Sequence, residues 1–148
     1  MSRYELYCFG ESGNAYKVAL FLEMSGIAWT ARFVDFFNGE TRTPEYRAHV
    51  NEMGEAPVLV DGDRKMTQSG VILQHLGRKH PKFAPDDLAE EEALRWMFFD
   101  NHKFTSYIAT LRFQISIAKT GETPVSEFLR GRALNSLKIV DAHLANRP

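Results

Sequence analysis

The chain has 148 residues and a formal net charge of -1, from 18 basic and 19 acidic side chains. The two signs balance in residues 1–85 and again in residues 86–148, so the basic excess of a nucleic-acid-binding protein is absent. Hydrophobic residues make up 44% and charged residues 25% of the chain, which indicates a globular protein and excludes bulk disorder.

The cysteine content and the hydropathy pattern restrict the compartment. Cys8 is the single cysteine, which excludes an intramolecular disulfide, a CxxC redox pair and a thiolate-rich zinc site. The N-terminus lacks the apolar segment of a signal peptide, and no stretch approaches the roughly 18 apolar residues of a membrane span. We therefore expect a cytoplasmic protein without a membrane partner, in which Cys8 is a small core residue.

The first 35 residues predict a strand, a helix and a second strand. Residues 4–9 are aromatic and apolar and stop at a glycine, which is typical of a buried strand followed by a loop. The apolar stripe in residues 18–24 is closed by Ser25-Gly26 and indicates a helix. Residues 27–35 predict the second strand, centred on Phe33 and Val34. This order implies a right-handed crossover between two parallel strands.

The next segment predicts a short helix and a hairpin. Thr43-Pro44 combines a capping residue with a proline at the first helical position, so we expect a helix to about residue 49. Residues 58–60 form a short apolar run after Ala56-Pro57. Asp61-Gly62 is a tight-turn signal, which pairs residues 64–67 back as an antiparallel strand.

The remainder of the chain is helical. Residues 69–79 predict a helix that closes a first domain, residues 1–80. Residues 81–85 contain two prolines and no periodicity, so they are interpreted as a linker. A long amphipathic helix over residues 86–119 and a second helix after Thr123-Pro124 make up residues 86–148, an all-α second domain.

The predicted order β-α-β-α-β-β-α, with a proline opening the third strand, defines an α/β thioredoxin-like domain. In that arrangement three segments meet: the loop at 12–14, the turn at Ala56-Pro57, and Gln68-Ser69 at the start of the last helix. Two of them lie at helix N-termini. Because such ends present unpaired N–H groups and a positive dipole, the cluster suits carboxylates and a thiolate.

These segments, in this order and spacing, resemble the cytosolic glutathione transferases along the whole chain. The matching pieces are residues 12–18 (SGNAYKV), 51–59 (NEMGEAPVL) and 67–72 (TQSGVI). The first loop is most similar to bacterial theta- and Nu-like members. The resemblance implies an N-terminal domain that binds glutathione and a helical domain, here only partial, because family members continue with several further helices.

The resemblance assigns Ser12 the hydroxyl that hydrogen-bonds the sulfur of glutathione, and Asn14 an amide that does the same in Nu-like members. Each residue has a structural alternative, since Ser12 suits a loop or helix cap and Asn14 a helix cap. The choice between Ser12 and Asn14 as the catalytic group that stabilises the thiolate stays open at this stage.

The other glutathione-binding residues implied by the resemblance are Glu55, Ala56, Pro57, Gln68 and Ser69. Pro57 matches the proline that follows a cis peptide bond, which turns the backbone of Ala56 toward the peptide ligand. Gln68 and Ser69 match the pair that holds the γ-glutamyl end, with Ser69 alternatively an ordinary helix cap. Glu55 departs from the Lys or Gln of many members, and its charge would repel the glycyl carboxylate.

The resulting hypothesis is a glutathione S-transferase that activates the thiolate for attack on a hydrophobic electrophilic small molecule. Glutathione is then a cosubstrate, and no cofactor or metal is expected, since the five histidines lack metal-site spacing. The alternatives are a non-catalytic binding module of the same fold, and a glutathione-dependent disulfide reductase or peroxidase, suggested by Asn14. A homodimer is expected.

Overall fold

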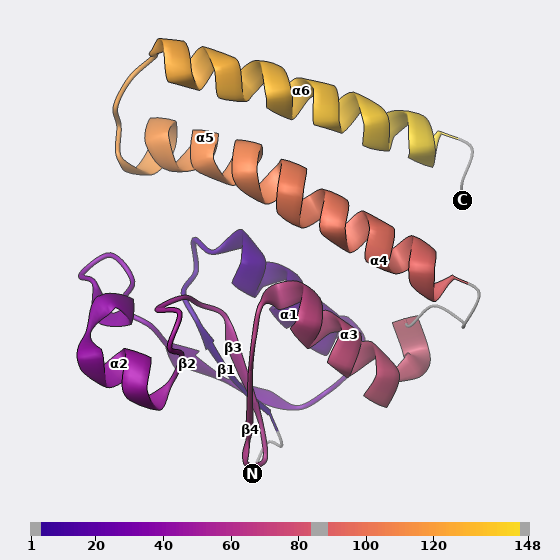
Figure 1. Ribbon diagram of the computed structural model, residues 1–148. Coiled ribbons are helices and arrows are strands. Elements are labelled where there is room, and N and C mark those ends of the chain that lie inside the picture. Colours follow the sequence, from indigo (N-terminus) through magenta and orange to yellow (C-terminus); the bar gives the residue numbers. More distant parts are fainter. Residues whose placement is uncertain (1–3, 84–88, 146–148) are drawn as a thin grey trace. The chain divides into compact units, whose positions relative to one another are not determined.

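A computed structural model describes residues 4–83 and 89–145 of the chain (Figure 1). The chain divides into two compact units, residues 1–88 and 89–148, and each unit is described by itself. Residues 84 and 85 of the predicted linker at 81–85 and the first residues of the helix predicted from residue 86 lie outside the described residues, while the start of that linker forms the short helix η2 (Pro81–Phe83).

The first unit is a four-stranded mixed sheet with helices, and it confirms the predicted thioredoxin-like order. The strands lie in the order β2-β1-β3-β4, with β1 and β2 parallel and the other pairs antiparallel. The elements are β1 (Tyr4–Cys8), α1 (Gly13–Met24), β2 (Trp29–Phe33), η1 (Glu40–Arg42), α2 (Pro44–His49), β3 (Val58–Asp61), β4 (Arg64–Thr67), α3 (Ser69–Lys79) and η2 (Pro81–Phe83).

The second strand is shorter than its sequence predicts. It was expected over residues 27–35 with Phe33 central, but β2 ends at Phe33, whose side chain is 76% exposed. The reason is its place at the edge of the sheet, where one neighbour alone supplies hydrogen bonds. Val34 follows the strand and is fully buried, and its amide still donates to the Cys8 carbonyl at 2.9 Å.

The core of the first unit lies on one face of the sheet. Leu6, Leu59 and Met66 face one another across β1, β3 and β4, which aligns three buried apolar side chains in a row. The fully buried side chains of α1 and α3 close over them, among them Leu22 and Ile72. Burying such a side chain contributes roughly 1.5–3 kcal/mol, so this face holds both helices against the sheet.

Cys8 packs against this core from the end of β1, as its apolar strand predicts. Partial burial raises the pKa of the Cys8 thiol. The protonated thiol is a poor nucleophile. Cys8 is therefore a packing residue.

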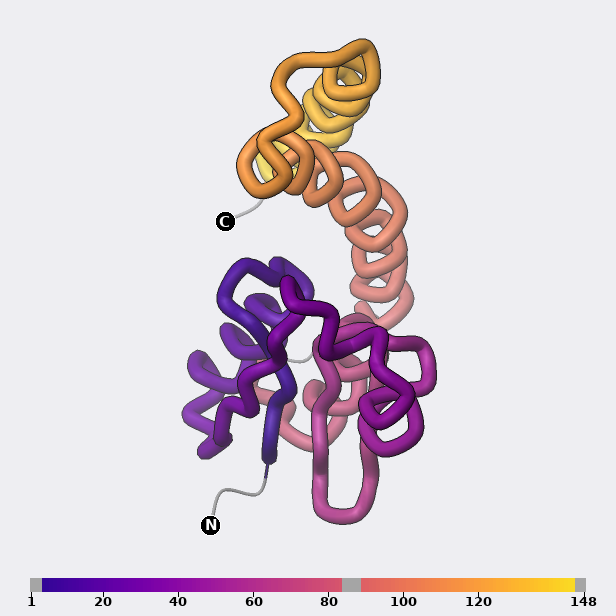
Figure 2. The backbone as a smooth tube through the Cα atoms, turned by 90° about the vertical axis from the view of Figure 1, so that its left-hand side faces the viewer, coloured from indigo at the N-terminus to yellow at the C-terminus, as the bar shows by residue number. Residues whose placement is uncertain are grey.

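The second unit is a pair of antiparallel helical segments (Figure 1). The first runs through α4 (Glu90–Phe99), η3 (Asp100–Ala109), α5 (Thr110–Arg112) and η4 (Phe113–Ile117), and Figure 2 shows it as one uninterrupted helical path. Its η3 and η4 parts have π-helical hydrogen bonding, which the amphipathic pattern did not predict.

The second helical segment is α6 (Pro124–Leu144), which begins as its sequence predicts. The Thr123 hydroxyl accepts from the Ser126 amide at 3.1 Å, and the Ser126 hydroxyl accepts from the Thr123 amide at 2.8 Å. This reciprocal pair satisfies two amide groups that the helix itself leaves unpaired. Across the described parts of both units, no helix is long and apolar enough to cross a membrane.

Candidate functional site

Six of the seven predicted site residues line one small, open pocket in the first unit. They come from three separate segments: the first turn of α1, the loop before β3, and the junction of β4 with α3. The residues are Asn14, Glu55, Ala56, Pro57, Gln68 and Ser69. The thioredoxin-like topology therefore brings these segments together as predicted.

Ser12 is the predicted residue that does not line this pocket. It is the N-cap of α1, and its Oγ accepts a hydrogen bond from the Ala15 amide at 3.1 Å. A capping hydroxyl uses its oxygen as the acceptor, so its own proton is still available to a ligand at the helix end. Because Ser12 holds the cap, the alternative interpretation of Asn14 as the cap is wrong.

Asn14 and Ser69 join the starts of α1 and α3. The Ser69 hydroxyl donates to Asn14 Oδ1 at 3.4 Å, across 55 residues of sequence. Ser69 is nearly buried and is the first residue of α3, after Gln68 at the cap position, so the alternative of Ser69 as the helix cap is also wrong. The free N–H groups of an 11-residue helix consequently open beside the Ser69 hydroxyl.

Gln68 connects this helix start to the loop before β3. Its Nε2 donates to Glu55 Oε2 at 3.0 Å and lies 3.5 Å from Met53 Sδ. Its backbone φ of 64° lies in the left-handed region, which is uncommon for a residue with a side chain. Since the amide nitrogen is engaged by Glu55, the side-chain oxygen of Gln68 is the end left to accept a hydrogen bond from a ligand.

Two buried side chains that the sequence analysis did not identify hold the loop that carries Glu55. The Glu55 carbonyl accepts from Asn51 Nδ2 at 2.9 Å and from the Tyr46 hydroxyl at 3.1 Å. Burial raises the pKa of Tyr46 to about 12, so its hydroxyl stays protonated and donates. Asn51 also accepts from the Met53 amide at 3.0 Å. The sequence did offer one signal for Asn51, because it is a polar residue within the segment 51–59 that matches the family.

The same loop has two backbone features that position Ala56. Gly54 has a φ of 69°, and a Cβ atom there would lie 2.7 Å from the Thr41 carbonyl oxygen. The Ala56–Pro57 peptide bond is cis, which confirms the expectation from the resemblance. β3 begins directly after Pro57, so Ala56 lines the pocket just before the start of a strand.

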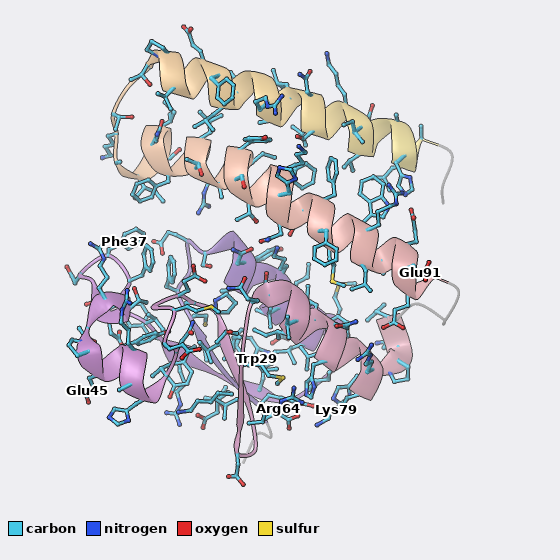
Figure 3. All side chains as sticks on the ribbon, in the orientation of Figure 1. Trp29, Phe37, Glu45, Arg64, Lys79 and Glu91 are labelled. Atoms are coloured by element: carbon cyan, nitrogen blue, oxygen red, sulfur yellow. The ribbon has the colours of Figure 1, made fainter. Side chains whose placement is uncertain are left out.

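The histidines show no metal-site arrangement, and in the described residues no three His, Cys, Asp or Glu side chains are grouped to hold a metal ion. Three of them have other partners. His75 Nε2 lies 2.9 Å from Asp61 Oδ2, beside Lys79 at the end of α3 (Figure 3). His80 contacts the Tyr4 hydroxyl at 2.9 Å, and His143 packs on Trp96 with ring centroids 4.2 Å apart.

Comparisons with known proteins agree with this geometry. Residues 2–78, just over half of the chain, match the family model described as the N-terminal domain of glutathione S-transferase. Among curated relatives, glutathione S-transferase 1 of Dianthus caryophyllus is 36% identical over 94 residues, which cover 62% of this chain and 42% of the relative. The transcriptional regulator URE2 of Saccharomyces cerevisiae is 34% identical over 106 residues, which cover 65% of this chain and 30% of URE2.

Solved structures match over almost the whole chain. A possible glutathione S-transferase from Rhodopseudomonas palustris has a TM-score of 0.90 and 34% identity, over 98% of this chain and 72% of that one. Ure2p in complex with glutathione has a TM-score of 0.87 and 27% identity, over 99% of this chain and 70% of that one. The chain thus spans less than half the length of the two curated relatives and about 70% of these two structures.

Proposed function

The chain belongs to the glutathione S-transferase family, and from that membership we propose that it binds glutathione and attaches it through its cysteine sulfur to an electrophilic small molecule. The observation that carries the proposal is the pocket in which Asn14, Glu55 and Ser69 converge with the Ala56–Pro57 turn. A solved relative of the same fold, Ure2p, binds glutathione. Glutathione is a cosubstrate in this reaction, and the proposal requires no metal or other cofactor.

The pocket offers distinct partners for the two ends of a zwitterionic peptide. The N-terminus of α3 suits a carboxylate because its N–H groups donate hydrogen bonds, and the Ser69 hydroxyl would donate to the same carboxylate in place of its 3.4 Å bond to Asn14 Oδ1. The Gln68 side-chain oxygen and the Glu55 carboxylate suit an ammonium group. The peptide backbone at Ala56 would pair with the cysteinyl residue in the manner of an added strand. In the proposed binding mode, the cysteine sulfur would lie toward the start of α1.

The chemical step depends on ionising that sulfur. A thiol with a pKa near 8.5 is mostly protonated at neutral pH, and only the thiolate is a good nucleophile. Lowering the pKa by about two units requires about 2.7 kcal/mol of preference for the charged form. A hydrogen bond to a charged acceptor contributes roughly 1.5–3 kcal/mol and a helix N-terminus roughly 0.3–1 kcal/mol. The Ser12 hydroxyl or the Asn14 amide, together with α1, is therefore sufficient without a general base.

The proposed transfer conserves atoms and charge. The thiol proton leaves to solvent, and the thiolate sulfur forms a bond to the electrophilic carbon. The electron pair of the broken bond departs with the leaving group, or moves into the acceptor when the electrophile has none. The residues at the start of α1 act by stabilising the sulfur anion before it attacks.

The test is to measure the thiol pKa of bound glutathione, from the thiolate absorbance across a pH series, in wild type, Ser12→Ala and Asn14→Ala. We expect at least one variant to raise that pKa by one unit or more and to slow conjugation of 1-chloro-2,4-dinitrobenzene in proportion. Ser12→Thr retains the hydroxyl and should restore the wild-type profile if Ser12 is the donor. Ser25→Ala, at the opposite end of α1, is the matched control. Unchanged profiles in both variants would refute this assignment.

A non-catalytic glutathione-binding module is the second candidate, and the 34% identity to the transcriptional regulator URE2 favours it. Retention on immobilised glutathione without turnover of the aromatic electrophile would support this candidate over the transferase.

We also propose that the chain forms a homodimer, since members of the family form homodimers. Sedimentation equilibrium at tens of micromolar should give twice the chain mass of 16.9 kDa, and a monomer would contradict it.

A further inference from the structure

A cationic cluster lies within the second unit, where α6 packs against η3. The Arg132 side chain of α6 donates to the Tyr107 hydroxyl of η3 at 3.3 Å. Its guanidinium carbon also lies 5.3 Å from the centre of the Tyr107 ring and 5.9 Å from that of Phe128. The Lys103 ammonium, one turn before Tyr107, lies 5.7 Å from the same tyrosine ring. Side chains fill the space between the two helical segments (Figure 3).

The two cations have no acidic partner among the residues that the structure describes. Other basic side chains of this unit do: Arg95 pairs with Glu92 at 2.6 Å, and Arg130 pairs with Glu122 at 2.6 Å. No ion pair with a described residue involves Lys103 or Arg132. Two like charges gathered on one ring repel each other, and a bound anion would offset that repulsion.

Tyr107 responds to these charges. The hydrogen bond from Arg132 lowers the pKa of the Tyr107 phenol, and the charges of Arg132 and Lys103 lower it further. Partial desolvation is the one opposing influence, and no carboxylate contributes. The surroundings of the hydroxyl are therefore cationic, and a phenol with a lowered pKa is a stronger hydrogen-bond donor than an ordinary tyrosine.

We propose that Lys103, Tyr107 and Arg132 form a binding site for a flat organic anion, an aromatic carboxylate. The guanidinium has five donors in a fixed fork, which matches the two oxygens of a carboxylate, and its packing on two rings pre-orients that fork. The Phe128 ring is on an exposed residue, 61% accessible, and offers a face on which the aromatic part of the ligand stacks. This site belongs to the helical unit and does not depend on the proposed transferase activity.

The primary test is calorimetric titration of the full chain with benzoate at low ionic strength, because exposed charges are screened by salt. We expect millimolar binding that Arg132→Gln weakens at least tenfold and Lys103→Gln at least threefold. Arg130→Gln is the matched control, because Arg130 lies on the same helix but is paired with Glu122, and its benzoate affinity should stay within twofold of wild type. Equal affinities in Arg132→Gln and Arg130→Gln would overturn the proposal.

Two further probes separate the charge from the ring. Benzamide, which has the ring without the charge, and acetate, which has the charge without the ring, should each bind at least fivefold more weakly than benzoate. Equal binding of either probe would refute the aromatic-carboxylate assignment. An independent readout is the absorbance of tyrosinate near 295 nm, in which the titration of Tyr107 is identified by comparison with Tyr107→Phe. Benzoate should raise the pKa of the Tyr107 phenol. No shift of that phenol on saturation with benzoate would also contradict the proposal.

Discussion

Replacing Gly54 by alanine tests two costs of placing a side chain in the loop before β3: the left-handed backbone conformation and a steric clash with Thr41. Gly54 has a φ of 69°, and an L-residue held in the left-handed region costs about 1–2 kcal/mol. A Cβ atom there would also lie 2.7 Å from the Thr41 carbonyl oxygen and 2.9 Å from Arg47 Nη2. The arginine can swing away, but the Thr41 oxygen is backbone, and Thr41 itself is buried. Such overpacking costs typically 1–3 kcal/mol, so Gly54→Ala should destabilise the first unit by about 3 kcal/mol.

Gly62→Ala is the matched control for this prediction. Gly62 has a similar φ of 62°, but a Cβ atom there meets nothing within 4 Å. It should therefore show the backbone cost alone, about 1–2 kcal/mol. Urea unfolding followed by circular dichroism gives both free energies, and their difference isolates the collision with Thr41. Equal destabilisation by the two substitutions, within about 0.5 kcal/mol, would refute the reasoning, since the loop would then accommodate a methyl group without cost.

Two further predictions concern the glutathione pocket and the helical unit. Ser69→Ala should weaken calorimetric affinity for glutathione about tenfold while leaving the thiol pKa unchanged, because the proposed partner of Ser69 is a carboxylate of the ligand and not the sulfur. Wild-type affinity would remove Ser69 from the proposed site. The hydrogen bonds from Arg95 and Trp96 lower the pKa of Glu92 to about 2, so its stabilising contribution is present above pH 4.5 and is lost as the pH falls toward 2. The midpoint temperature of thermal unfolding of Glu92→Gln should therefore be close to that of wild type at pH 2 but lower than wild type at pH 6. Glu91→Gln, at the start of α4 (Figure 3), is the control and should have the wild-type midpoint at both pH values. A difference between Glu92→Gln and wild type that does not change with pH would contradict this.

The fold was predictable because its signals are local and agree with one another. Residues 4–9 are apolar up to a glycine, Thr43-Pro44 begins α2, and Asp61-Gly62 closes the hairpin, each confirmed by the structure. The errors arose where tertiary contacts decide. The length of β2 depends on its place at the sheet edge, which residues 27–35 do not encode. The π-helical hydrogen bonding of η3 was likewise not predicted, because an amphipathic pattern indicates a helix without giving its hydrogen-bond type.

The pocket was predictable as a set of segments but not as a set of contacts. The topology brings Asn14 and Ser69 together, but the sequence left Ser12 open between a helix cap and a ligand contact, and it did not show that Ser12 would lie outside the pocket lining. Tyr46 and Asn51 were missed because they act indirectly, by donating hydrogen bonds to the backbone carbonyl of Glu55. A buried tyrosine and a buried asparagine resemble ordinary core and turn residues until their hydrogen-bond partners are known.

Glu55 shows how a contact can change the meaning of a residue. From the sequence, its carboxylate was expected to repel the glycyl end of the peptide. In the structure Gln68 Nε2 binds that carboxylate at 3.0 Å, which places the charge beside the start of α3, on the side of the pocket that suits the γ-glutamyl end. A helix N-terminus favours anions and a carboxylate favours cations, so the two together select a ligand that carries both charges close to one another. An α-amino acid group has that pattern, whereas a simple anion would gain from the helix and lose to Glu55.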